Sequence, residues 1–167
     1  MGSLDRPFNP LALALGSGAT FVCRTIDIET KHMQAIIKRS YSHKGTAFIE
    51  IYQNCNIFND GAFAPMTDKE SKADKVLWLE NGQPMLFGAK QNKGIRLDGN
   101  KPIVVTIGKK WSVDDLLVHD EGDYVIASLL SNMTYQGDFP DPIGVLYAID
   151  APTYEDLMSD QIDKAVK

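Results

Sequence analysis

Two short runs rich in strand-forming residues decide the predicted fold: Thr20-Phe21-Val22-Cys23-Arg24 and Ala47-Phe48-Ile49-Glu50-Ile51-Tyr52. Between them lies an amphipathic helical pattern that Asp27 or Thr30 could open and that Gly45 ends. A strand, a helix and a strand joined by short loops form a βαβ unit, so the two strands should be parallel with a right-handed crossover. Because parallel sheets are covered on both faces, this unit is expected to end a larger α/β domain that begins upstream of Met1.

The segments on either side of this unit carry their own signals. Asn9 and Pro10 suit the start of a short helix that Gly16 and Gly18 would stop. Farther along, the sequence predicts a charged, solvated segment over 66–75, a hairpin at Asn81-Gly82, a turn over 98–100, a helix over 125–133, a strand over 143–149 and a final helix from Pro152. The predicted fold class is therefore α/β, with a parallel N-terminal part and a mixed α/β C-terminal extension.

The amino-acid composition excludes several classes of protein. The 167 residues are 44% hydrophobic and 23% charged, as in ordinary globular proteins and unlike disordered, collagen-like or disulfide-scaffold chains. The net charge of −5 disfavours a nucleic-acid partner. No run approaches 18 apolar residues and no secretory signal is visible, so we expect a cytoplasmic protein without a membrane partner. Two cysteines fit reduced thiols in that compartment.

Motif searches assign no catalytic residue. His32 and His43 are expected on a solvated helix face, and Asp120, next to His119, is expected to cap a helix. The glycines at 16 and 18 follow a helix and precede a strand, which is the reverse of the order that a phosphate-binding loop needs.

Cys55 is the one residue that hints at chemistry. It lies in an asparagine-rich loop at the carboxyl end of the second predicted strand, where ligands usually bind in α/β sheets. A thiolate there could accept hydrogen bonds from the side-chain amides of Asn54, Asn56 and Asn59 and from backbone amides of the turn towards Gly61. From spacing alone, an incidental loop cysteine is the more frequent interpretation. Cys23, inside an apolar strand, is expected to be a small buried hydrophobe.

Three stretches, residues 1–10, 19–25 and 44–61, resemble the beta subunit of 2-oxoacid:ferredoxin oxidoreductases, most closely the 2-oxoglutarate type. Agreement continues through residues 94–99, 116–120 and 142–145, so that the resemblance spans nearly the whole chain. It covers only the C-terminal half of such a subunit.

The resemblance implies oxidative decarboxylation of a 2-oxoacid on thiamine diphosphate, with formation of an acyl-coenzyme A and transfer of electrons to ferredoxin. In the family, a GDG…N motif binds thiamine diphosphate and Mg²⁺, and three cysteines help to hold a 4Fe–4S cluster. All of these lie upstream of the position that Met1 matches. The fourth cluster ligand falls on Cys55, the only site residue that the resemblance assigns here. The chain alone is expected to bind no cofactor and to be inactive.

The resemblance also implies a division and a set of partners. Residues 1–54 would close the thiamine-diphosphate-binding α/β domain, and residues 55–167 would form the C-terminal domain of the beta subunit. The expected partners are the upstream half of the beta subunit, the alpha subunit and ferredoxin. The alternative is a non-catalytic protein-interaction domain that retains the fold without cofactors. An in-frame upstream half with GDG and CxxC motifs would favour the subunit.

Overall fold

The computed structural model describes residues 4–166; residues 1–3, where the first stretch of resemblance starts, and residue 167 lie outside the described part. The elements follow one another as α1 (Pro10–Gly16), β1 (Phe21–Ile26), α2 (Thr30–Tyr41), β2 (Ala47–Tyr52), α3 (Ala64–Thr67), α4 (Lys72–Lys75), β3 (Val76–Trp78), β4 (Leu86–Phe87), β5 (Lys93–Asp98), β6 (Lys101–Thr106), η1 (Val113–Asp115), α5 (Tyr124–Met133), β7 (Asp141–Ala148) and α6 (Tyr154–Val166). The predicted charged segment thus contains α4, and the predicted C-terminal helices and strand are present as α5, β7 and α6.

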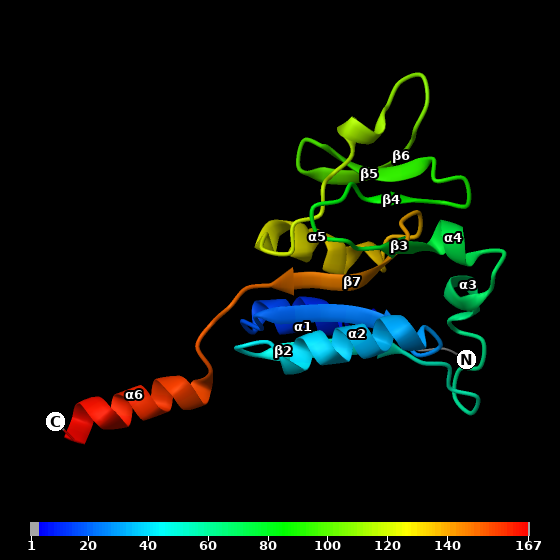
Figure 1. Ribbon diagram of the computed structural model, residues 1–167. Coiled ribbons are helices and arrows are strands. Elements are labelled where there is room, and N and C mark those ends of the chain that lie inside the picture. Colours follow the sequence, from blue (N-terminus) through cyan, green and yellow to red (C-terminus); the bar gives the residue numbers. More distant parts are fainter. Residues whose placement is uncertain (1–3, 167) are drawn as a thin grey trace.

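A four-stranded sheet with the order β2-β1-β7-β3 forms the centre of the fold (Figure 1). β1 and β2 pair in parallel, in register from Phe21 opposite Ala47 to Ile26 opposite Tyr52, and α2 connects them. This confirms the predicted βαβ unit. β7 lies antiparallel to β1 and parallel to β3, so the sheet is mixed.

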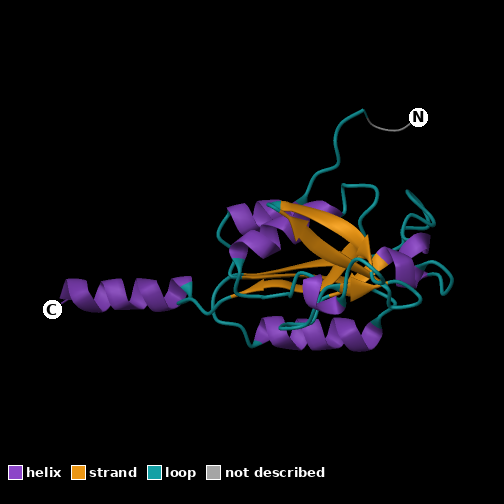
Figure 2. Cartoon of the chain, turned by 90° about the horizontal axis from the view of Figure 1, so that it is seen from above, coloured by secondary structure: helices purple, strands orange, loops and turns teal. Residues whose placement is uncertain are grey.

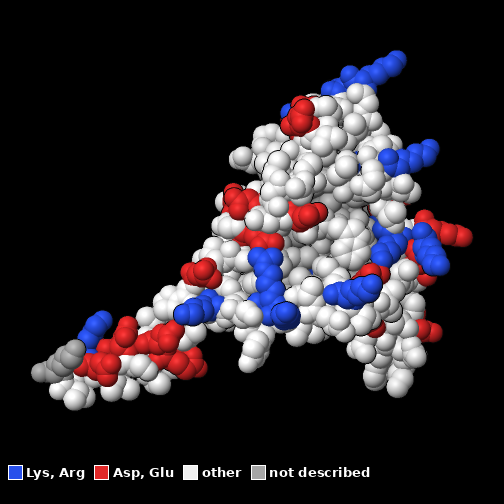
Figure 3. Space-filling model, viewed as in Figure 1, with Lys and Arg blue, Asp and Glu red and all other residues white. Residues whose placement is uncertain are grey.

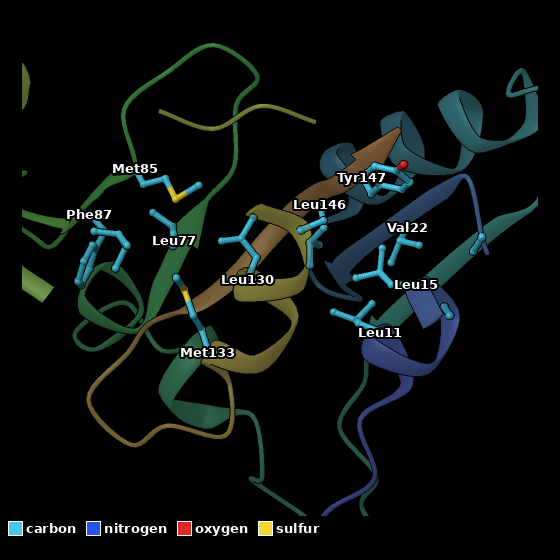
Figure 4. Close-up of a cluster of buried hydrophobic side chains, with 14 residues drawn as sticks. Leu11, Leu15, Val22, Leu77, Met85, Phe87, Leu130, Met133, Leu146 and Tyr147 are labelled. Atoms are coloured by element: carbon cyan, nitrogen blue, oxygen red, sulfur yellow. The ribbon is translucent and has the colours of Figure 1, made fainter. Parts of the chain in front are cut away.

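Helices cover both faces of this sheet (Figure 2). Every residue of β1 is buried, and alternate side chains point to opposite faces. Val22 packs with Leu11 of α1 and Leu130 of α5 in the larger core (Figure 4). Cys23 packs instead with Ile36 of α2. A central strand buried on both faces explains why the run from Phe21 to Cys23 is apolar without alternation.

A smaller antiparallel sheet, β4-β5-β6, lies beside the first one. The turn predicted over residues 98–100 is confirmed, because Asp98 pairs with Lys101 at the end of a β5–β6 hairpin. The hairpin predicted at Asn81-Gly82 is wrong. Gly82 does turn, with φ of 76°, but β3 and β4 belong to different sheets. The backbone around Gly82 bonds to residues 117–119 instead, and the Gly82 amide donates to the His119 carbonyl at 2.7 Å.

The N-cap predicted for α1 is present, whereas the one predicted for α5 is a different residue. The Asn9 side chain accepts a hydrogen bond from the Ala12 amide at 3.0 Å, so the predicted cap of α1 is confirmed. The expectation that Asp120 caps a helix is wrong, because its carboxylate accepts from the Gly122 amide within a turn. Asp123 caps α5 in its place and accepts from the Val125 amide at 2.7 Å.

The proposed division between residues 54 and 55 stays a prediction. β3 and β7, from the C-terminal side of that boundary, share one sheet with β1 and β2. Within residues 4–166, β2 forms the edge of this sheet and pairs with β1 alone. Its free edge is where a further strand of a larger parallel sheet would add.

Helix α6 leaves the body of the molecule altogether (Figures 1 and 2). Its first turn is held by the Thr153 hydroxyl, which accepts from the Asp156 amide at 3.1 Å, and the helix has no buried residue. None of the helices between residues 4 and 166 is long and apolar enough to cross a membrane.

Candidate functional site

Cys55 lies just beyond the carboxyl end of β2, in the loop where it was predicted, and its side chain is exposed. The loop turns back on itself at this residue. The Asn59 amide donates to the Cys55 carbonyl at 3.0 Å, and the two residues form an isolated antiparallel bridge. The thiol therefore stands on an ordered turn at the edge of the sheet, open to a partner.

The asparagine side chains of this loop bind one another and the loop backbone. The Asn54 amide donates to Asn56 Oδ1 and Asp60 Oδ1, each at 2.8 Å, and Asn54 Oδ1 accepts from the Gly61 amide at 2.9 Å. The expected role of Asn54 as a donor to the thiolate is therefore wrong. Its side chain closes the loop instead.

The backbone amides that were also expected as donors do hydrogen-bond the Cys55 sulfur. The pKa of the Cys55 thiol is lowered by hydrogen bonding from the backbone of Phe58, then from that of Ile57, with a smaller contribution from Asn59. Hydrogen bonds to the charged form favour it, so this turn stabilises a thiolate. A thiolate is the form of cysteine that binds iron.

The fit of an iron–sulfur cluster to these residues is good for one ligand. Cys55 offers an exposed sulfur with amide donors around it, which suits a ligand in a cluster that further chains or segments complete. Across residues 4–166, no group of three or more His, Cys, Asp or Glu side chains could hold a metal ion.

Cys23 has the opposite environment. It is fully buried, its sulfur lies 3.6 Å from the Phe48 carbonyl oxygen, and burial raises the pKa of its thiol to about 12. The prediction of a small buried hydrophobe is confirmed.

Each of the three histidine rings lies within hydrogen-bond distance of another residue of the fold. His32 Nδ1 lies 2.8 Å from Thr25 Oγ1, and His43 Nε2 lies 2.8 Å from Thr20 Oγ1. The expectation that both sit on a solvated face is therefore wrong, since they join α2 and its C-terminal turn to β1 and to the residue before it. His119 is buried, with Nε2 at 2.8 Å from the Val145 carbonyl oxygen, and burial lowers its pKa.

A buried ion cluster around Arg24 escaped the sequence analysis. Arg24 is fully buried; its Nε donates to Glu50 at 2.6 Å and its Nη1 to Thr134 Oγ1 at 2.6 Å. Asp141 lies 3.7 Å from Nη1, and the guanidinium stacks over the Tyr52 ring at 4.7 Å. Arg24 and Glu50 occupy paired positions of β1 and β2. The sequence does carry a signal for this ion pair. Each of the two apolar strands contains one charged residue, and the two charges are opposite.

The Arg24 cluster reaches the surface through Thr134. This residue lines an open pocket of about 580 Å³, together with Arg6, Asn9, Asn132 and Tyr135. Burial raises the pKa of Asp141, and the Thr134 hydroxyl and Arg24 oppose that rise. The cluster thus ties the edge strand β2 to β1 and β7 through charge as well as through the backbone.

Comparison with known proteins shows what this chain is similar to. No family model matches the chain. It is 36% identical over 164 residues to the 2-oxoglutarate oxidoreductase subunit KorB of Mycobacterium tuberculosis, a match that covers 97% of this chain and 43% of that protein. The chain is similar in sequence to beta subunits of 2-oxoacid:ferredoxin oxidoreductases. The subunit beta of such an enzyme from Saccharolobus solfataricus is 43% identical over 58 residues, covering 35% of this chain and 19% of that protein.

The fold agrees with this relationship. A solved 2-oxoglutarate:ferredoxin oxidoreductase from Magnetococcus marinus matches with a TM-score of 0.61 and 21% identity, over 98% of this chain and 41% of that one. The α/β class and the resemblance to an oxidoreductase beta subunit are thus confirmed. The chain spans less than half the length of these relatives.

Proposed function

We propose that this chain is the C-terminal part of a 2-oxoacid:ferredoxin oxidoreductase beta subunit, acting on 2-oxoglutarate. The observation that carries the proposal is the 36% identity to KorB, named as a 2-oxoglutarate oxidoreductase subunit, along 97% of this chain. The related solved enzyme holds 2-oxoglutarate, coenzyme A and succinyl-CoA. The proposed partners are the rest of the beta subunit, an alpha subunit and ferredoxin.

Cys55 is the residue of this chain that we assign to the cofactors. A 4Fe–4S cluster takes one thiolate for each iron, so Cys55 supplies one ligand and the rest of the subunit supplies three. When bound, the cluster carries single electrons towards ferredoxin. The exposed sulfur and the amide donors of the 57–59 turn support this assignment. The donors also favour the reduced, more negative state of a cluster that Cys55 holds.

The free edge of β2 supports the same arrangement. The unpaired backbone groups of an edge strand can pair with a further strand, and residues 1–54 are proposed to close the thiamine-diphosphate-binding domain. Beside this edge, an apolar groove of about 280 Å³ runs between Phe8, Leu13 and Phe48. We assign the groove and the edge to contact with the upstream half of the beta subunit.

The 167-residue chain by itself is expected neither to bind thiamine diphosphate tightly nor to oxidise a 2-oxoacid. The reason is that its sequence carries no GDG…N motif to bind the diphosphate through Mg²⁺. Calorimetric titration with thiamine diphosphate and Mg²⁺ tests the expectation, and binding in the micromolar range would contradict it. Supplying the upstream half and the alpha subunit should restore binding and turnover, which gives the titration its positive control.

A further inference from the structure

The loop that carries Cys55 has two large apolar side chains at its tip. Ile57 is 84% exposed and Phe58 is 90% exposed. Apart from these two and Cys55, residues 53–61 are glutamine, asparagine, aspartate and glycine. The loop extends beyond the end of β2, at the opposite end of the molecule from α6 (Figure 1), and its tip is largely uncharged (Figure 3). An adjacent apolar pair in so polar a loop indicates a surface that something else covers.

The fold of the chain does not explain the exposed Phe58 ring. Phe63, a few residues farther on, has a structural role, because it is partly buried and stacks on the Tyr52 ring with centroids 4.5 Å apart. Phe58 has no ring partner among residues 4–166. The hydrogen bonds of the Asn54 side chain already close the loop. The Phe58 side chain is therefore free to contact a group outside this chain.

The same two residues contribute the peptide groups that lie at the Cys55 sulfur. The backbone of Phe58 and then that of Ile57 make the largest contributions to the lowered pKa of the thiol. Each amide nitrogen is bonded to the Cα that carries the side chain, so each side chain begins two bonds from a donor to the sulfur. The Asn59 amide, which donates to the Cys55 carbonyl at 3.0 Å, closes the turn around both residues. Any group bonded to the sulfur therefore lies next to Ile57 and Phe58.

We propose that Ile57 and Phe58 form an apolar cover over the iron–sulfur cluster that Cys55 holds, and that they keep water away from it. This inference rests on the proposed assignment of Cys55 to a cluster. An apolar shell around a metal site limits solvent access and so changes its reduction potential. Water favours the reduced, more negative state, so excluding water lowers the potential. The side chains of the turn thus lower the potential, whereas its amides, which donate to the sulfur, raise it.

A surface of ferredoxin is the other occupant that these two side chains could contact. The geometry favours the cluster, because a group bonded to the Cys55 sulfur reaches the turn before a second protein can. The two occupants also differ in what a substitution changes. Loss of a cover alters the potential and the air stability of the cluster, whereas loss of a docking contact raises the KM for ferredoxin and leaves the potential unchanged.

Phe58→Ala in the assembled enzyme tests the cover. The midpoint potential is measured by redox titration of the electron paramagnetic resonance signal, and the loss of iron is followed in air. We expect a more positive potential and a several-fold faster loss of iron than in the wild type. Phe58→Leu keeps an apolar side chain and should stay close to the wild type in both measurements. Because Phe58 is exposed and its amide remains in both variants, the turn and its donors are retained.

Tyr41→Ala is the matched control. Tyr41 is also an aromatic residue that is 90% exposed, but it ends α2 and precedes the start of β2, whereas Cys55 follows the end of that strand. Its loss should change neither the potential nor the air stability. A Phe58→Ala enzyme in which both are unchanged would overturn the cover, whether or not the KM for ferredoxin rises. A wild-type assembly without a cluster, or a cluster that survives Cys55→Ser, would instead refute the assignment of Cys55, so the two failures are distinguishable.

Discussion

Cys55→Ser is expected to remove or degrade the iron–sulfur cluster of the complete enzyme and to stop electron delivery to ferredoxin. A serine hydroxyl does not replace the thiolate that the backbone of Phe58 and Ile57 stabilises. Decarboxylation of the 2-oxoacid should suffer less, because the groups proposed to bind thiamine diphosphate lie outside this chain. The measurement is iron content together with the electron paramagnetic resonance signal of the reduced enzyme.

Cys23→Ala is the matched control for that experiment. Cys23 is buried and its raised pKa keeps it a thiol, so its loss should leave iron and signal unchanged. Equal iron and an identical signal in the wild type and in Cys55→Ser would remove Cys55 from the cluster.

Arg24→Ala is expected to destabilise the chain by about 3–5 kcal/mol, because it leaves Glu50 and Asp141 without their buried cation. Denaturant unfolding measures the loss. Arg39→Ala is the control, because Arg39 is half exposed where it pairs with Glu121, and an exposed pair contributes at most about 1 kcal/mol. A loss at Arg24 no larger than that at Arg39 would show that the buried cluster is not an energetic centre of the fold.

The loss at Arg24 should also depend on pH. Burial already raises the pKa of Asp141, and removing the arginine takes away a cation that opposes the rise. A carboxyl whose folded-state pKa is raised stabilises the fold below that pKa and loses this contribution as pH rises through it. Arg24→Ala should therefore lose less free energy of unfolding at acidic than at neutral pH, and a loss that is constant across that range would contradict this account.

The sequence predicted the parts of the fold that local patterns determine. β1, α2 and β2 have apolar runs, helical spacing and glycine stops, and the structure contains the parallel unit that they imply. The Asn81-Gly82 hairpin failed because the turn residues were read correctly but their hydrogen-bond partners, residues 117–119, lie far along the chain. The antiparallel place of β7 beside β1 depends on the same kind of long-range pairing.

Local sequence patterns also predicted only part of the candidate site. Spacing placed Cys55 in a loop after β2, but only the family resemblance gave it a role. Its donors were predicted in part. The backbone amides of the turn hydrogen-bond the sulfur as expected, whereas the Asn54 side chain binds Asn56 and Asp60 instead. Arg24 was overlooked because its neighbours hide it in an apolar strand, and its partners come from β2, β7 and the end of α5.

Reduction of ferredoxin by the assembled enzyme tests the central claim most directly. The chain is combined with the upstream half of the beta subunit and the alpha subunit, and reduction is followed with 2-oxoglutarate and coenzyme A. We expect reduction that requires both substrates and that disappears when this chain is left out. Reduction that proceeds equally well without the chain, or an assembly that binds the chain yet reduces no ferredoxin with any 2-oxoacid, would contradict the account.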